Sequence, residues 1–142
     1  MESLSRVFGT SETEPDPQAL LQFLADLGWN SEAHFHGDEQ GWFRLGFGDD
    51  ETMRVERYLA SEEGMRAELN TWAAWVEASG EDANRAELMR ILISTKQVMI
   101  LHNFPPQLAG HASCYLAWKT DGICQVDGAG FFDADGNLLL PE

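Results

Sequence analysis

The sequence predicts a single α+β domain in which a mostly antiparallel sheet packs with about four helices. Its length of 142 residues is usual for one domain, and 44% of the residues are hydrophobic, as in other globular proteins. Segments with apolar residues at helical spacing are separated by segments in which apolar and polar residues alternate. Gly, Asp and Pro residues that favour turns lie between these segments.

The first helix is expected to begin after a polar N-terminal segment. Residues 1–15 are rich in Ser, Thr, Glu and Pro, which predicts a mobile tail, so the domain is assigned to residues 16–142. Asp16 is a suitable N-cap, Pro17 suits the first helical position, and Gly28 ends the helix. Apolar residues recur between them at helical spacing, namely Leu20, Leu21, Phe23, Leu24 and Leu27.

Three short segments of alternating polarity follow, AHFH, GWFRLGFG and TMRVERYLA. Because turn formers separate them, we predict an antiparallel three-strand meander. Alternation divides the second segment between two faces, with Trp42, Arg44 and Gly46 on one and Phe43, Leu45 and Phe47 on the other. The free edge or the uncovered face of this meander can pair with another chain, which makes it the first candidate surface for a partner.

Two helices are predicted after the meander. The segment SEEGMRAELNTWAAWVEASG has a helix-start signal at Ser61 and ends at Gly80, with a core stripe of Met65, Leu69, Trp72 and Val76. A second helix runs from Asp82 to about Ser94. It is apolar nearly all round and is therefore expected to be well buried.

The C-terminal third predicts a central strand, a helix and a hairpin. QVMILHNF is apolar on both faces, and the helix from Pro106 ends at Gly122. Asp135-Gly136 between FFDA and NLLL is a hairpin signal.

An EF-hand calcium loop does not fit this segment. Aligning the glycine of that loop with Gly136 or Gly128 puts Phe131 or Ile123 at its first position, where an oxygen ligand is needed. Cation binding by clustered aspartates remains the alternative to turn chemistry, with Asp127, Asp133 and Asp135 as ligands. The expected architecture carries the helices on one face of the sheet.

Charge restricts the partners that the chain can bind. It has 24 acidic and 9 basic residues, a formal net charge of −15. Such a field repels nucleic-acid phosphates and anionic lipids and speeds encounter with cationic proteins. We therefore expect no nucleic acid and no membrane as partners. Two interpretations of the acidic surface stay open, a solvated surface that keeps the protein soluble and a surface that binds a basic protein partner. The candidate contacts are Asp49, Asp50 and Glu51 in the meander and Trp75, which lies partly off the core stripe and is either an exposed anchor or part of a wide core face.

Localisation and redox state are predicted from what the sequence lacks. It has neither an apolar stretch of membrane-span length nor a signal-peptide pattern, so we expect a cytoplasmic protein with reduced thiols. A disulfide between Cys114 and Cys124 stays open for an oxidising compartment.

A metal site is the alternative suggested by residues 28–46, GWNSEAHFHGDEQGWFRLG. This stretch resembles the first metal-binding motif of the cupin family, which implies that His34 and His36 bind a transition metal. Side chains two apart on a strand do share a face. The chain departs from the pattern because fewer residues separate His36 from Glu39 and because it turns helical after Ala60. A weaker version of the hypothesis joins this pair to His102 or His111 across the fold.

Catalytic and cofactor motifs are not found. His111, Ser113 and Cys114 lie on one predicted helix, but their spacing builds no activated nucleophile. No phosphate loop or dinucleotide fingerprint precedes a helix, so no cofactor is predicted and no catalytic residue is assigned.

The sequence thus favours a non-enzymatic protein-interaction module that acts as an acidic adaptor, chaperone or inhibitor towards a more basic protein. Its opening order of a helix and three strands resembles that of the small acidic chaperones of type III secretion, which implies homodimerisation. After the next helix the order departs from that family. The alternative is a small metal-dependent enzyme or metal-binding protein that uses His34 and His36.

Overall fold

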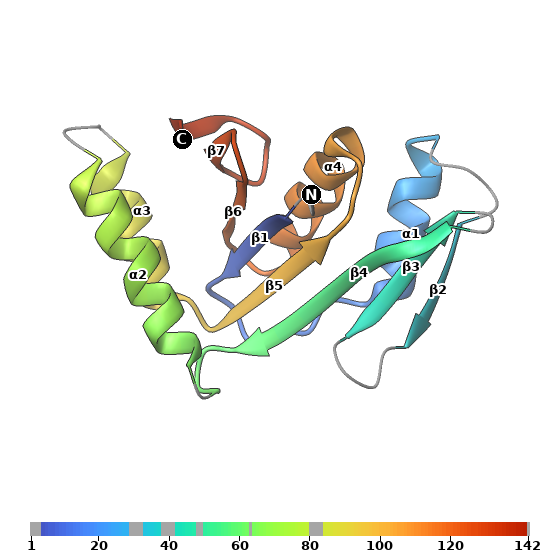
Figure 1. Ribbon diagram of the computed structural model, residues 1–142, viewed down its shortest axis with the longest axis horizontal. Helices are drawn as coiled ribbons and strands as arrows, with labels where there is room; N and C mark the ends of the chain where they lie inside the picture. The colour runs from blue at the N-terminus through green and yellow to red at the C-terminus, as the bar shows by residue number, and fades with distance from the viewer. Residues whose placement is uncertain are drawn as a thin grey trace.

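A single antiparallel sheet organises the protein. The computed structural model describes residues 4–28, 33–37, 42–47, 50–62, 64–79 and 84–141, and within them eight strands pair in the order β2-β3-β4-β5-β1-β6-β7-β8 (Figure 1). The strands are β1 (Leu4–Gly9), β2 (Ala33–Gly37), β3 (Phe43–Phe47), β4 (Asp50–Leu59), β5 (Gln97–His102), β6 (Ile123–Val126), β7 (Gly130–Phe132) and β8 (Leu138–Pro141). The helices are α1 (Pro17–Asp26), α2 (Met65–Ala78), α3 (Arg85–Ser94) and α4 (Pro106–Lys119). The predicted α+β class is confirmed.

Strand β1 lies inside the sheet, between β5 and β6. The composition of the segment that contains it predicts a mobile tail instead. Val7 and Phe8 are fully buried on opposite faces of the sheet. The prediction over residues 1–15 is therefore wrong for Leu4–Gly9. The strand is short and lies in a polar segment, and its pairing partners are far away in the sequence, so local composition does not reveal it.

The residues that follow β1 are also fixed. Gln97 of β5 is fully buried, and its Nε2 donates to the carbonyl oxygens of Ser11 at 2.6 Å and Thr13 at 2.8 Å. Its Oε1 accepts a hydrogen bond of 2.7 Å from Nε of Arg57. A buried amide with several partners holds this loop against the end of the sheet.

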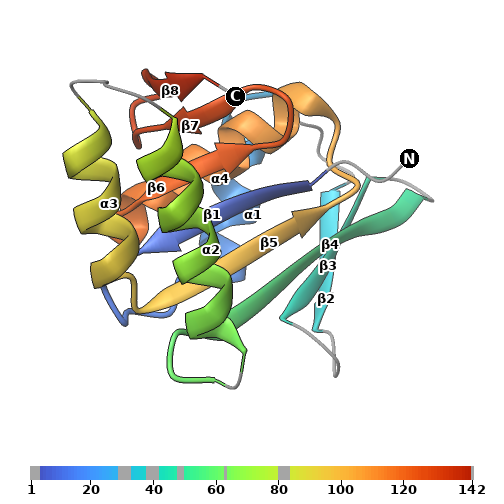
Figure 2. The same cartoon turned by 60° about the vertical axis from the view of Figure 1, so that its left-hand side comes forward.

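Helices cover both faces of the sheet, whereas the sequence predicted cover on one. Helices α1 and α4 pack with Val7, Val55 and Met99, and α2 and α3 pack with Phe8 and Val98 (Figures 1 and 2). The cause is that β1 and β5 have apolar residues at successive positions, Val7 and Phe8 in β1 and Val98 and Met99 in β5, and so present apolar side chains to both sides of the sheet. Two helical layers are needed to bury them.

The helix termini follow the sequence signals only in part. Oδ1 of Asp16 accepts a 3.0 Å hydrogen bond from the backbone nitrogen of Gln18, as predicted for an N-cap. Helix α2 begins at Met65 instead of near Ser61, after Gly64 with a φ of 84°. Helix α3 begins at Arg85, and Ile93 is 63% exposed, so this helix is less buried than its composition predicts.

The C-terminal aspartates act in turns, as expected. Oδ1 of Asp133 accepts hydrogen bonds of 2.9 Å from the backbone nitrogens of both Asp135 and Asn137. Nδ2 of Asn137 donates to Oδ2 of the same carboxylate at 3.1 Å. Within the described ranges, no group of three or more His, Cys, Asp or Glu side chains is arranged to hold a metal ion.

Replacing Gly122 with alanine is expected to destabilise the fold. A Cβ atom at Gly122 would lie 1.9 Å from the carbonyl oxygen of Phe8, and neither backbone can move freely because β1 is paired on both sides. Urea unfolding of Gly122→Ala should show a loss of about 2 kcal/mol or more. The control is Gly110→Ala in α4, where a Cβ meets nothing within 4 Å and should be neutral or stabilising by up to about 1 kcal/mol. Equal stability of the two variants would contradict this packing.

Candidate functional site

The α2 side of the sheet is covered by helices over only part of its width. The strand residues buried under α2 and α3 come from β1 and β5 to β8, namely Phe8, Val98, Ile123, Phe131 and Leu140. Figure 2 shows both helices in front of that half and away from β2 and β3. We call the remaining surface on this side, lined by Arg44, Arg54, Glu56, His102 and Arg6, the open face.

A row of basic residues crosses the open face. Arg44 of β3 is directly opposite Arg54 of β4, and Arg54 is directly opposite His102 of β5. Residues directly opposite each other on antiparallel strands share a face, and like charges there destabilise the pair. Three neighbouring strands, β3, β4 and β5, thus place Arg or His side by side in a chain with a net charge of −15.

Glu56 is the centre of the hydrogen bonding on this face. Its Oε2 accepts a 2.8 Å bond from the hydroxyl of Tyr58, and its Oε1 contacts Nε2 of His102. A guanidinium nitrogen of Arg54 lies 3.5 Å from Oε1. The side chains of Glu56 and His102 are only 17% and 13% exposed, so these contacts are partly shielded from water.

These contacts decide the protonation states of the cluster. Burial raises the pKa of Glu56, but hydrogen bonds from Tyr58 and His102 lower it. The lowering effects together are larger, so the pKa of Glu56 is below its ordinary value. Burial and the bond to Glu56 raise the pKa of Tyr58 to about 12. At neutral pH Glu56 is therefore a carboxylate and Tyr58 keeps its proton.

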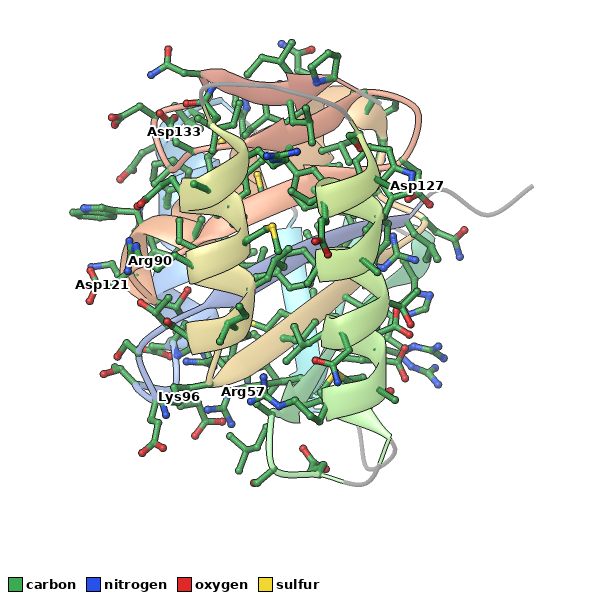
Figure 3. All side chains as sticks on the ribbon, turned by 90° about the vertical axis from the view of Figure 1, so that its left-hand side faces the viewer. Arg57, Arg90, Lys96, Asp121, Asp127 and Asp133 are labelled. Atoms are coloured by element: carbon green, nitrogen blue, oxygen red, sulfur yellow. The ribbon has the colours of Figure 1, made fainter. Side chains whose placement is uncertain are left out.

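Arg6 marks the border between the open face and α2. Its guanidinium donates 2.8 Å hydrogen bonds to Oε1 of Gln125 and to Oδ1 of Asp127. It also lies 5.0 Å from the ring centroid of Trp72 in α2, a cation–π contact. In Figure 3 Asp127 lies just beyond α2 on that side. These contacts fix Arg6 and neutralise much of its charge locally.

The arrangement suits binding better than proton transfer. Both oxygens of Glu56 are engaged, so its main effects are to orient His102 and Tyr58 and to offset part of the charge of Arg54. The guanidinium groups of Arg44 and Arg54 lie on neighbouring strands of this face. Guanidinium groups bind carboxylates in a bidentate geometry, so an acidic group is a complementary ligand for this surface.

The histidines of the metal hypothesis are not brought together with the other histidines. His34 and His36 lie on the edge strand β2, opposite Gly46 and Arg44, and their side chains lie outside the described part of the structure. His102 lies three strand spacings away from β2, roughly 14 Å, and is held by Glu56. His111 is on α4, on the opposite side of the sheet. Neither is placed to complete a site with the β2 pair.

The other predicted contact residues have different outcomes. Trp75 is 36% exposed, and its ring packs 5.9 Å from that of Phe131 and 6.4 Å from that of Trp72, between centroids. It therefore covers the α2 core while keeping one side in solvent. Asp49 lies outside the described residues. Asp50 and Glu51 are on β4, and their side chains are likewise not described.

The residues of the open face were missed in the sequence, although part of the signal was there. In TMRVERYLA, alternation separates Arg54, Glu56 and Tyr58 from Met53 and Val55. This pattern assigns three polar or aromatic side chains to one face. Their contact with His102 and their position beside Arg6 depend on the order of the strands, which the pattern does not contain.

A cavity of about 840 Å³ lies near the start of α2. Its lining alternates in charge, with Arg57, Arg66 and Lys96 among Glu12, Glu14 and Glu62. Figure 3 shows Arg57 and Lys96 together at that end of the molecule. Because the charges are balanced and Arg57 is held by Gln97, this cavity indicates no particular class of ligand.

Comparison with known proteins gives no assignment. No protein family model, curated protein or solved structure matches the chain. Among the described residues, no helix has the length and apolar character needed to cross a bilayer. The functional argument therefore depends on the geometry of the open face.

Replacing Glu56 with glutamine should destabilise the protein at neutral pH. The folded-state pKa of Glu56 is below the ordinary 4.5, so its stabilising contribution is present above about pH 4.5 and is lost as the pH falls through the lowered value. We expect Glu56→Gln to lose about 1 to 3 kcal/mol at pH 7, with a smaller difference from wild type at pH 3.5. Urea unfolding at both pH values measures this. Glu87→Gln on α3, which removes an exposed pair with Arg90, is the matched control and should change little. A loss for Glu56→Gln that is the same at both pH values would refute the assignment.

Proposed function

We propose that this protein is a non-enzymatic interaction module of the adaptor, chaperone or inhibitor kind, and that it binds a protein partner on the open face. The observation that carries the proposal is that Arg44 and Arg54 are directly opposite each other on a sheet surface that α2 and α3 leave uncovered. An acidic group supplied by a partner can form charge-assisted hydrogen bonds with guanidinium groups on this surface.

The expected partner follows from two electrostatic effects, one at long range and one at the contact. The net charge of −15 acts over long distances and favours encounter with a protein of net positive charge. The contact itself is local, and a carboxylate is the protein group that suits Arg44 and Arg54. A basic protein that presents an acidic side chain or C-terminus at its contact surface meets both requirements. Long-range charge sets the association rate, and the local contact sets specificity.

The edge next to the open face supports the same proposal. Strand β2 ends the sheet on this side, and an edge strand offers backbone groups to an added strand. Strand β8 forms the other edge of the sheet, and part of its backbone is already hydrogen-bonded, because Nδ2 of Asn84 donates to the carbonyl oxygen of Leu139 at 2.9 Å. A partner on the open face can therefore extend over β2. A second copy of the chain paired along β2 is the homodimeric form of this proposal.

Charge reversal on the open face tests the proposal. Immobilised wild-type protein captures its partner at low salt, and the partner is identified and then titrated as purified protein. Arg54→Glu and the separate variant Arg44→Glu should each weaken binding at least about tenfold. Arg90→Glu on the exposed surface of α3 changes the net charge equally and should bind as wild type apart from a small change in association rate. Circular dichroism confirms that each variant is folded.

Two results would contradict the proposed function. One is an equal loss of binding in Arg54→Glu and Arg90→Glu, which would assign the effect to net charge alone. The other is a native mass spectrum that shows a monomer with one transition-metal ion, removed by a chelator and lost in His34→Ala. That result would favour the metal-dependent alternative.

A further inference from the structure

A second cavity lies on the opposite side of the sheet from the open face. It encloses about 520 Å³ between α4 and strands β6 and β7, and its wall is mainly apolar, with Phe23, Val126 and Phe132 among the lining residues. Cys114 of α4 and Cys124 of β6 both line it. The two cysteines of the chain thus meet in one pocket, from elements that are adjacent in space.

The two thiols line the same cavity but differ in their surroundings. Cys124 is buried beneath α4, whereas Cys114 is half-buried, with its Sγ 3.9 Å from the carbonyl oxygen of Asp133. Cys114 is therefore the thiol that a molecule entering from solvent reaches first.

The two thiols shift each other's pKa in opposite directions. The neighbouring Cys124 thiol lowers the pKa of Cys114, against burial and the carboxylates of Asp133 and Asp135, which raise it. The neighbouring Cys114 thiol and burial raise the pKa of Cys124. Cys114 is therefore the thiol that loses its proton more readily, and Cys124 keeps its proton. A thiolate is the nucleophilic form of cysteine.

We propose that Cys114 and Cys124 form a two-cysteine redox site that reacts with a small organic hydroperoxide. Cys114 is the attacking thiol, Cys124 is the resolving thiol, and the apolar cavity holds the organic group of the oxidant. The charges around the site select against the other common oxidant, a glutathione-type disulfide. Such a molecule is anionic, and it is repelled by Asp133, Asp135 and the net charge of −15.

The reaction balances without a further reagent. The Cys114 thiolate attacks the terminal oxygen of the hydroperoxide, the O–O bond breaks, and the products are a sulfenic acid on Cys114 and an alkoxide that takes up a proton to leave as the alcohol. The sulfur of Cys124 then attacks the sulfur of Cys114. The S–S bond forms, and hydroxide leaves with the proton of Cys124 as water. Two thiols are oxidised to one disulfide, and one hydroperoxide is reduced to an alcohol.

The first test uses the reduced wild-type protein. It is mixed separately with cumene hydroperoxide, hydrogen peroxide and glutathione disulfide, and intact and peptide mass spectrometry follow the Cys114–Cys124 disulfide. We expect the disulfide to form at least about tenfold faster with cumene hydroperoxide than with glutathione disulfide at low salt. It should also form faster with cumene hydroperoxide than with hydrogen peroxide, because only the organic molecule uses the apolar wall. Faster reaction with glutathione disulfide, or no intramolecular disulfide with any oxidant, would overturn the proposal.

The second test separates the roles of the two thiols. In Cys124→Ala, oxidation should stop at the sulfenic acid of Cys114, which dimedone traps, and in Cys114→Ala, the buried Cys124 should stay unreacted. Circular dichroism and urea unfolding check the fold of both variants. The oxidation rates of the wild-type protein test the proposal even if a variant does not fold. Equal dimedone labelling of Cys124 in Cys114→Ala would show that the assigned order is wrong. The cavity has no lining residue from α3, so Arg90→Glu on the exposed surface of that helix should leave the oxidation rate unchanged.

Discussion

The pairing of β1 with both β5 and β6 is the constraint on which the rest of the structure depends. This first strand joins the β2 to β5 half of the sheet to the β6 to β8 half, and without it each half would end in an open edge. Val7 and Phe8 also belong to the two separate cores, one on each face. The close approach of Gly122 to the carbonyl of Phe8 fixes where the end of α4 meets this strand.

The positions of the helices follow from this central strand. The α2 and α3 pair is inserted between β4 and β5, and it covers the apolar side chains of β1 and of β5 to β8. Helix α1 lies near β2 on the other side of the sheet. The α2 side of β2, β3 and the neighbouring part of β4 therefore receives no helix from the described chain. There the strands carry Arg44, Arg54 and Glu56 in place of a second apolar set.

The two proposed sites use opposite faces of the same sheet. On β6, Cys124 faces α4, while the next residue, Gln125, binds Arg6 at the border of the open face. On β1, Val7 is opposite Cys124, and Arg6 is opposite Gln125. One sheet thus supports a charged binding surface and an apolar thiol pocket with separate chemistry. The alternation of side chains along a strand is what keeps them apart.

The sequence by itself determined the elements whose signals are local. The Asp16 and Pro17 start of α1, the meander, the buried strand QVMILH and the Asp-Gly hairpin follow from capping, alternation and turn chemistry within a few residues. Tertiary structure decided the place of β1, the division of the helices between two faces, and the meeting of Glu56 with His102 and of Cys114 with Cys124. The physical reason is that strand pairing and side-chain contact across the sheet depend on groups far apart in the chain, and local propensity carries no information about which distant strand completes the ladder.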